Sequence, residues 1–551
     1  MRSMETAPSG GRRRSAHSAG GSEERIPWWR RAVIYEIAII SFQDSDGDGR
    51  GDLAGLLSRM DYLEWLGIGA VWLTPLYPSP MLDLGYDIVD YCDIDPAFGT
   101  LEQFDRLIQE LHQRDIRLIL DFVPNHTSDQ HPWFLESRSS RRNPKRDWYI
   151  WADPSDNGGP PNNWQSRFSG SAWQWDDTTG QYYYHSFLRE QPDLNWRSPA
   201  VREAMAEVLR FWMKRGVDGF RVDASAVLAK DELLRDNPVD PEADESKPPP
   251  QRYKNTFTDD RPEAMTYLAD LRKVVGEFDE RMLCGEVQGK TDRIGHFYGQ
   301  DNPRLHLPLN FALLDSPWDA ISLQANIDAY LNAIPDKAWP DWVVGGHDKH
   351  RIASKLGQAQ ARNLAMLLLT LKGTPFFYAG DELGMEQITI PADRVIDPFE
   401  KLVPGYDLNR DPERAPMRWD DSLNGGFSKG EPWLPMGLGV AERNVAVLQK
   451  DDRSLLQLYK RLIALRVSEP GLTVGDYVPV PSRNDILTYR RVVDGEAIFV
   501  ALNLVPEARR LTWQGAGRLL LTTHLDQFHG ERVRGPLLLR PDEGVVIKLK
   551  D

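Results

Sequence analysis

Short apolar runs alternate with longer amphipathic stretches from about residue 30 to about residue 470. Eight of the short runs have the branched aliphatic content of buried parallel strands. They are Val33–Ile40, Ala70–Pro75, Arg117–Val123, Gly219–Ala224, Met282–Val287, Leu307–Leu314, Trp342–Gly346 and Thr374–Ala379. Strands that alternate with helices over this length predict an α/β fold with a parallel sheet, and eight such units predict a (β/α)8 TIM barrel.

The longer stretches carry helix signals. Thr100 and Gln103 have the spacing of a capping box, and an apolar stripe at helical spacing follows them. A second stripe ends at Gly216, a typical C-terminal stop. The two stripes consist of Phe104, Leu107, Ile108 and Leu111, and of Val201, Met205, Val208, Leu209 and Trp212.

Two segments interrupt the alternation, and both follow predicted strands. Residues 127–198, rich in Trp, Asn, Gly and Pro, are long enough for a subdomain inserted after the third strand, and residues 228–260 predict a long mobile loop. In a barrel both would lie over the C-terminal face, where active sites form. After about residue 470 short strands predict a C-terminal all-β sandwich. These strands are Ile486–Arg491, Ala497–Leu504, Arg509–Gln514, Arg518–His524 and Val545–Lys550.

The predicted domains are a disordered tail at 1–25, barrel segments at 26–126 and 199–470, an inserted subdomain at 127–198 and a β-sandwich at 471–551. The first 25 residues are rich in Ser, Gly and Arg, and no apolar stretch follows their basic residues, so we expect no secretory signal. Because no run of about 20 apolar residues occurs, we expect no membrane span.

Composition narrows the class of partner. The formal net charge of −16 would repel a nucleic-acid backbone but is compatible with a neutral substrate such as a sugar. The 2 cysteines argue against a disulfide framework and favour a reducing, cytoplasmic compartment. The sequence leaves the oligomeric state open.

Polar residues of unusual type cluster at the ends of predicted strands. The third strand ends in DFVPNH at 121–126, the fourth reads GFRVD at 219–223, the fifth ends in GEV at 285–287 and the seventh in GHD at 346–348. In this fold, such positions are typical of catalytic groups.

Two of these acids have contrasting surroundings. Arg221 and Asp223 are two apart on a strand and share a face, and an adjacent cation would keep Asp223 ionised, as a nucleophile needs to be. Glu286 follows an apolar run, where desolvation would keep it protonated. One ionised and one protonated carboxyl group about 5–5.5 Å apart cleave a glycosidic bond with retention. Taken alone, an Arg-x-Asp pair is more often structural, but three acids at three strand ends are harder to explain in that way.

The segments DFVPNH, GFRVDA, GEV and GHD, in this order, resemble the conserved regions of the α-amylase superfamily of glycoside hydrolases (glycoside hydrolase family 13). QPDLN at 191–195 resembles the α-glucosidase and oligo-1,6-glucosidase branch. The resemblance runs from about Pro27 to the C-terminus. It implies Asp223 as nucleophile, Glu286 as general acid/base and Asp348 as the acid that stabilises the transition state. It further implies sugar contacts from Tyr86, Asp87, His126, Arg221, His347 and Arg414.

The chain departs from the family pattern at three places. Gly346 stands where the family usually has Asn, the first strand reads YEIAIISF where many relatives carry a Pro-Arg pair, and Arg418 stands where Gln is common. None of these departures removes a catalytic group. With glycine at position 346, the sequence does not identify the group that replaces one hydrogen bond beside the third acid, Asp348.

The segment DSDGDGRGD at 44–52 places acids at every second position: Asp44, Asp46, Asp48 and Asp52. Several oxygen ligands on a tight turn suit a hard cation, although Gly55 at the twelfth position excludes a complete EF-hand. In the family branch the equivalent loop binds structural Ca²⁺ through these side chains and the carbonyl at the Arg50 position. The alternative is an acidic solvated turn.

Three functions remain open. The first is hydrolysis of terminal α-linked glucose from short oligosaccharides. The second is glucosyl transfer or isomerisation through the same intermediate, and DQHPWF…NPKRDWYIW does resemble a trehalose synthase, although Arg351 after HDKH favours the α-glucosidase pattern. The third is a non-catalytic barrel protein, which the retention of all three acids argues against. The small Ala224 after the nucleophile favours α-1,4 or mixed linkage, since relatives that prefer α-1,6 bonds have Val there.

Overall fold

The structure is a computed structural model and describes residues 26–287, 293–527 and 529–550, so the predicted tail at 1–25 lies outside the described residues. Within these residues all eight predicted strands form one parallel sheet. They are β1 Ile34–Ile37, β2 Ala70–Leu73, β3 Arg117–Phe122, β7 Gly219–Val222, β8 Met282–Glu286, β9 Leu307–Leu309, β10 Asp341–Val343 and β11 Thr374–Tyr378.

The sheet curves into a nearly closed barrel in the order β10-β11-β1-β2-β3-β7-β8-β9. At the seam the backbone N–H of Asn310, just after β9, donates to Asp341 Oδ1 of β10 at 3.0 Å. Apolar side chains from these strands fill the interior, among them Ile34, Trp72, Ile119, Cys284, Leu307, Val343 and Phe376. The predicted TIM barrel is therefore confirmed, and its filled interior leaves the strand ends as the place for a site.

Helices cover the outside of the barrel. Both predicted helices are present: α4 (Leu101–Gln113) begins with the Thr100–Gln103 capping box, and α6 (Pro199–Arg215) ends at Gly216, whose φ is 112°. The predicted apolar stripes of both helices are buried. The other long helices are α7 Pro262–Val275, α9 Ala320–Ala333, α10 Ile352–Thr370 and α13 Leu455–Ser468, and shorter ones include α2 Leu53–Ser58, α3 Met60–Leu66 and α8 Ile294–Tyr298.

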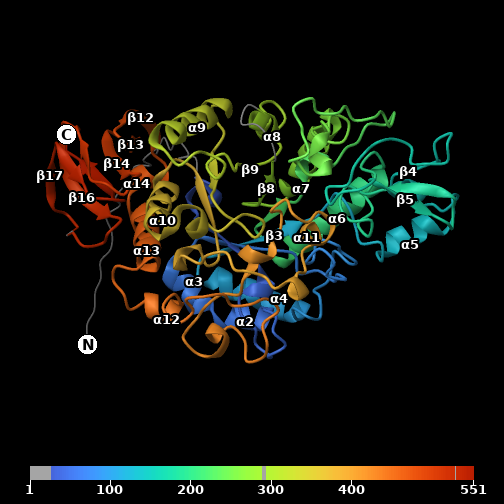
Figure 1. Cartoon of the computed structure of the whole chain (residues 1–551), viewed down its shortest axis with the longest axis horizontal. Helices are drawn as coiled ribbons and strands as arrows, with labels where there is room; N and C mark the ends of the chain where they lie inside the picture. The colour runs from blue at the N-terminus through green and yellow to red at the C-terminus, as the bar shows by residue number, and fades with distance from the viewer. Residues whose placement is uncertain (1–25, 288–292, 528, 551) are drawn as a thin grey trace, which may run out of the picture.

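The chain between β3 and α6 forms α5 (Pro132–Ser139) and a three-stranded antiparallel sheet of β4 (Trp151–Ala152), β6 (Gln181–Tyr184) and β5 (Trp173–Asp176). This sheet lies at the opposite end of the molecule from the C-terminal strands (Figure 1). The connection between β4 and β5 contacts the loop at 228–260: Trp164 Nε1 donates to Arg235 O at 2.8 Å, and Asn163 Nδ2 donates to Asn237 O at 2.9 Å.

The C-terminal strands form a six-stranded sheet, in the order β12-β13-β14-β19-β16-β17, and a two-stranded sheet, β15-β18. Leu511 of β15 and Leu539 of β18 pack with Phe499 and Ile547 of the larger sheet, so the region is all-β and layered as predicted. The strands are β12 Asp476–Arg483, β13 Ile486–Val493, β14 Glu496–Asn503, β15 Arg509–Leu511, β16 Ala516–Thr522, β17 Arg532–Arg534, β18 Leu537–Leu539 and β19 Gly544–Leu549.

In the part of the chain that the structure describes, no helix has the length and apolarity needed to cross a bilayer. Cys92 and Cys284 are both free thiols. The predicted compartment stays a prediction.

Candidate active site

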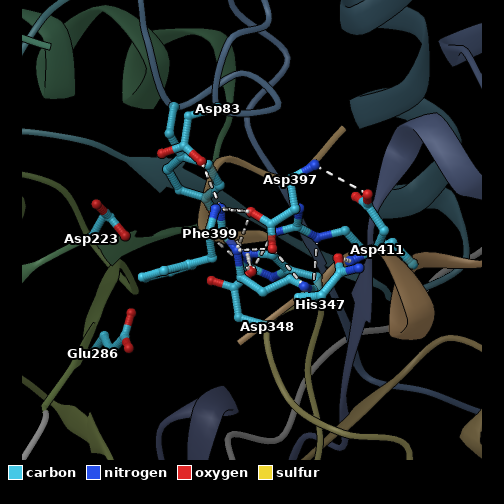
Figure 2. Close-up of polar contacts among 12 residues, drawn as sticks. Asp83, Asp223, Glu286, His347, Asp348, Asp397, Phe399 and Asp411 are labelled. Carbon is cyan, nitrogen blue, oxygen red and sulfur yellow. Dashed lines mark hydrogen bonds and ion pairs between the residues drawn. The ribbon is translucent and has the colours of Figure 1, made fainter. Parts of the chain in front are cut away.

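A cavity of about 420 Å³ opens where the strands end, and it brings together residues that are far apart in the sequence. Asp223 follows β7, Glu286 ends β8 and Asp348 follows β10, and all three line the cavity. Figure 2 shows their carboxyl groups around a common space. Tyr86 and His126 line it as well, as do Asp83, Phe168, Phe187, Ala224, Phe399, Arg410 and Glu413.

Arg221 is the centre of the first half of the site. The guanidinium is buried, and its Nη1 donates to Asp121 Oδ1 at 2.8 Å and to Asp223 Oδ1 at 2.7 Å. Its Nη2 donates to Glu286 Oε2 at 2.5 Å. One cation therefore holds both predicted catalytic carboxyl groups by charge-assisted bonds, with Asp121 behind it.

The expectation that the charge of Arg221 dominates at Asp223 is not borne out. Burial raises the pKa of Asp223 to about 7 despite the opposing charge of Arg221, and the carboxylates of Glu286, Asp121 and Asp348 add to the effect of burial. Carboxyl groups that share one cation titrate as a pair. Asp223 and Glu286 thus share one cation, an arrangement that suits a retaining pair, in which one carboxyl group is ionised and the other is protonated.

Asp348 has the opposite environment. Arg414 donates to Asp348 through Nη2 and to the carbonyl of His347 through Nε at 2.9 Å, and Arg410 Nη1 lies 3.5 Å from Asp348 Oδ1. Although burial opposes ionisation, the charges of His347, Arg410 and Arg414 hold the pKa of Asp348 well below its usual range. Asp348 is therefore a fixed anion at the pH at which Asp223 titrates.

Two of the predicted sugar contacts touch each other. The rings of Tyr86 and His347 stack with centroids 5.7 Å apart, and Tyr86 OH lies 2.9 Å from His347 Nε2. His126 is buried behind them, with Nε2 3.0 Å from the carbonyl of Tyr86. These contacts orient the polar edges of the cavity wall before any sugar arrives.

Asp87 lies elsewhere than predicted. It is fully buried, accepts from Ser79 Oγ at 2.8 Å and from the backbone N–H groups of Leu82 and Asp83 at 3.0 and 3.2 Å, and burial raises its pKa to about 6. The described cavity wall includes Asp83 rather than Asp87. Asp87 therefore fixes the loop that presents Asp83.

Asp83 and Arg410 are site residues that sequence reasoning missed. Arg410 Nη2 donates to Asp83 Oδ1 at 2.9 Å and to Asp397 Oδ1 at 2.7 Å, and its guanidinium lies 4.9 Å from the ring centroid of Phe399 (Figure 2). Both residues lie close in sequence to predicted sugar contacts, three residues before Tyr86 and four before Arg414. Their acid–base pairing was the missing signal, since it joins positions 327 residues apart.

The predicted calcium loop offers carboxylate ligands in a cluster. One oxygen from each of Asp44, Asp46 and Asp48 lies within 4.8 Å of the others, a donor set that suits a hard cation. Asp52 instead caps α2, accepting from Gly55 N at 2.7 Å, and also accepts from Ser45 N at 2.8 Å. The chemistry of the first three residues fits Ca²⁺, while the contributions of Asp52 and of the Arg50 carbonyl stay predictions.

Comparisons with known proteins agree with the geometry. The α-amylase catalytic domain model matches residues 37–475. A probable α-glucosidase of Rhizobium meliloti (strain 1021) is 41% identical over 87% of this chain and 90% of its own, and the oligo-1,6-glucosidase of Parageobacillus thermoglucosidasius is 38% identical over 87% and 91%. The α-glucosyl transfer enzyme XgtA superposes with a TM-score of 0.89 at 35% identity, covering 96% of this chain and 100% of XgtA. The trehalulose synthase MutB from Pseudomonas mesoacidophila MX-45 gives 0.86 at 34% identity, covering 96% and 100%.

A parallel barrel with carboxyl groups at three strand ends, matched along most of its length by such relatives, defines the class of enzyme as glycoside hydrolases. This chain belongs to the α-amylase family and, within it, to the branch of the α-glucosidases and oligo-1,6-glucosidases. The non-catalytic alternative is thereby set aside.

Proposed function

We propose that the protein is a retaining α-glucosidase that removes terminal α-linked glucose from short oligosaccharides. The observation that carries the proposal is the contact of one buried guanidinium, that of Arg221, with both Asp223 and Glu286. This contact supports a shared task for the two carboxyl groups, because it holds them at the ends of neighbouring strands β7 and β8, where both line the cavity.

The proposed reaction uses Arg221 in both steps. Asp223 attacks the anomeric carbon while Glu286 gives its proton to the leaving oxygen, so that Asp223 becomes an ester and Glu286 becomes the carboxylate. Glu286 then takes a proton from water, which attacks the same carbon and releases Asp223. The pair carries one negative charge before and after the first step, and Arg221 contacts each group that bears it. A preorganised cation of this kind lowers the barrier without having to move.

Asp348 is proposed to stabilise the positive charge that develops on the sugar ring. Its low pKa supports this role, because the group stays an anion over the pH range in which Asp223 and Glu286 exchange a proton. The Asp83–Arg410 pair lines the same cavity and offers an acceptor and a fixed cation to sugar hydroxyls. We place the non-reducing terminal glucose between this pair and the catalytic carboxyl groups.

We further propose α-1,4 or mixed linkage preference. Ala224 lines the cavity directly after Asp223, and its small side chain leaves room for the second sugar. One of the relatives is an oligo-1,6-glucosidase, so a preference for α-1,6 linkage is the alternative to test. Turnover of maltose and of isomaltose should be compared under the same conditions, and a strong preference for isomaltose would contradict this part of the proposal.

Glucosyl transfer or isomerisation is the second candidate. It is favoured by the similarity to XgtA, an α-glucosyl transfer enzyme, and to MutB, a trehalulose synthase. Both candidates share the ester on Asp223 and differ in whether water or a sugar attacks it.

The deciding experiment is incubation of the purified protein with maltose, with every sugar resolved over time and Asp223→Ala as control. Free glucose alone would establish hydrolysis. Trehalose, isomaltose or longer products without the matching glucose would establish transfer. No turnover of maltose, sucrose or isomaltose would contradict both candidates.

A further inference from the structure

Two consecutive glycines, Gly345 and Gly346, follow β10, and a buried carboxylate from another strand occupies the space beside the second. A Cβ on Gly346 would lie 3.2 Å from Glu36 Oε2, so a larger residue would press on Glu36. Glu36 belongs to β1 and is 2% exposed. Glu36 therefore lies beside Gly346, where the sequence does not identify the group that replaces the hydrogen bond of the usual Asn next to Asp348.

The carboxylate of Glu36 is directed at one residue. Its Oε1 lies 2.5 Å from His347 Nδ1 and accepts from the backbone N–H of His347 at 3.2 Å. These two contacts fix both the ring and the main chain immediately before Asp348. The positions are 311 residues apart in the sequence, yet β1 and the end of β10 are separated by β11 alone.

The contacts determine how many protons His347 carries. The hydroxyl of Tyr86 donates to Asp121 Oδ2 at 3.0 Å, so its oxygen accepts from His347 Nε2 at 2.9 Å. His347 Nδ1 faces a carboxylate and therefore donates as well. A ring that donates through both nitrogens is an imidazolium.

We propose that Glu36 is a positioning residue that holds His347 as an imidazolium, so that the ring acts as a charged donor beside Asp348 and the bound glucose. The role toward glucose rests on the proposed glucosidase function, while the charge of His347 does not. Glu36 acts entirely through His347, whose Nε2 lies 3.4 Å from Oδ1 of Asp348 in the cavity wall.

The charges around His347 are consistent with this role. Three acids lie near the ring: Glu36 on β1, Asp121 on β3, and Asp348, which is the next residue in the chain. The positive charge of Arg414 acts against them. Burial lowers the pKa of His347, but Asp348 and Glu36 outweigh burial and the charge of Arg414, so that the pKa is raised. With Glu36 neutralised, we expect His347 to lose its proton at lower pH.

The test uses the full-length protein with ¹⁵N-labelled histidine and records the ring nitrogen signals by NMR. The signal of His347 is assigned by its loss in His347→Gln. We expect an imidazolium at pH 7.5 in the native protein and a neutral ring in Glu36→Gln, which keeps the size of the side chain and removes its charge. In the same variant we expect kcat/KM for maltose to fall about 10- to 100-fold and its alkaline limb to shift to lower pH.

Glu382→Gln is the matched control. Glu382 is also buried and accepts from Tyr35 OH at 2.7 Å and from Tyr62 OH at 2.6 Å, and Tyr35 points to the opposite face of β1 from Glu36. We expect this variant to keep the imidazolium signal and the pH profile, even if its thermal stability falls. Gly346→Ala approaches Glu36 from β10 instead and should shift the His347 signal toward the neutral ring, which provides a second variant if Glu36→Gln fails to fold.

A neutral His347 in the native protein, or an imidazolium that persists unchanged in Glu36→Gln and Gly346→Ala, would overturn the assignment whatever the turnover of maltose. An imidazolium that depends on Glu36 would support it even in a protein that turned over no glucoside, an outcome that would count against the proposed function alone.

Discussion

Both sides of the cavity carry an aspartate, but the pKa is raised on one side and lowered on the other. On one side Arg221 is shared by Asp121, Asp223 and Glu286, so carboxyl groups outnumber the cation, and the pKa of Asp223 is raised to about 7. On the other side three cations, His347, Arg410 and Arg414, act on Asp348 and hold its pKa well below its usual range. Two of these cations have further acidic partners, since Arg410 also contacts Asp83 and Asp397 and His347 contacts Glu36. The comparison shows that the number of cations acting on an acid separates Asp223, whose pKa is raised, from Asp348, which stays an anion.

The largest expected effect comes from removal of Asp223, the group that exchanges charge with Glu286. We expect Asp223→Ala to lower kcat/KM for maltose by at least about 10⁴-fold, because no glycosyl ester can form. Steady-state kinetics on a preparation free of wild-type enzyme measure the loss. Residual activity within about 100-fold of the native value would assign the nucleophile to another residue.

Glu286→Gln separates the role of general acid from that of nucleophile, the two roles proposed for the carboxyl groups that contact Arg221. We expect turnover of maltose to fall by about 10²–10⁴-fold, since the leaving sugar needs a proton. Formation of the glycosyl-enzyme from an aryl glucoside with a good leaving group should be much less affected. Rapid-mixing measurement of the aryl leaving group distinguishes the cases, and an equal slowing for all leaving groups would contradict the acid assignment.

Neutralising Asp348 and neutralising Asp223 should change the free energy of unfolding in opposite directions. Asp348→Asn removes a carboxylate that His347, Arg410 and Arg414 share, so we expect the free energy of unfolding to fall by about 3 kcal/mol at pH 8. Asp223→Asn should raise it at pH 8. The folded-state pKa of Asp223 exceeds its unfolded value, so the stability linked to this group is fully present below about pH 4 and is lost as the pH rises through about 7.

Denaturant unfolding at pH 5 and pH 8 checks these signs. The gain from Asp223→Asn should be larger at pH 8 than at pH 5, where the native group is already largely protonated. A loss of stability in both variants at pH 8 would mean that Asp223 is held as an anion in the same way as Asp348.

The smallest expected effect lies outside the cavity, at the acidic loop. If Asp44, Asp46 and Asp48 hold a structural Ca²⁺, a chelator should lower Tm by a few degrees while kcat for maltose stays within about twofold. Asp46→Asn should lower Tm and abolish the response to the chelator. An unchanged Tm in both experiments would identify the loop as an acidic turn without a metal.

Much of the fold could be predicted because its signals are local. The eight barrel strands are continuous apolar runs, and each one was found. Among the missed strands of the C-terminal domain, β12 and β17 lack that signal: β12 is an edge strand with largely exposed side chains and carries Pro479 and Pro481. The third, β18, is apolar but only three residues long. The half-buried edges of the C-terminal domain therefore have to be read from the structure.

The candidate site divides in the same way. The three acids and Tyr86 could be named from short segments, and the structure brings them to one cavity, with the ring of His347 stacked on Tyr86. What decides their charge could not be named, because it depends on pairs such as Glu36 with His347 that join distant strands. The charge of Asp223 was predicted wrongly for this reason: its neighbour Arg221 was visible in the sequence, but the competing Asp121 and Glu286 were not.

The most direct test of the account is to trap the intermediate and locate it. The protein is incubated with a fluorinated glucosyl fluoride that forms the ester faster than water cleaves it, digested with pepsin and analysed by mass spectrometry. The account predicts one fluoroglucosyl group on Asp223, with no label on Asp348 and no label in Asp223→Ala. A label on another residue, or hydrolysis with inversion at the anomeric carbon and no label at all, would contradict it.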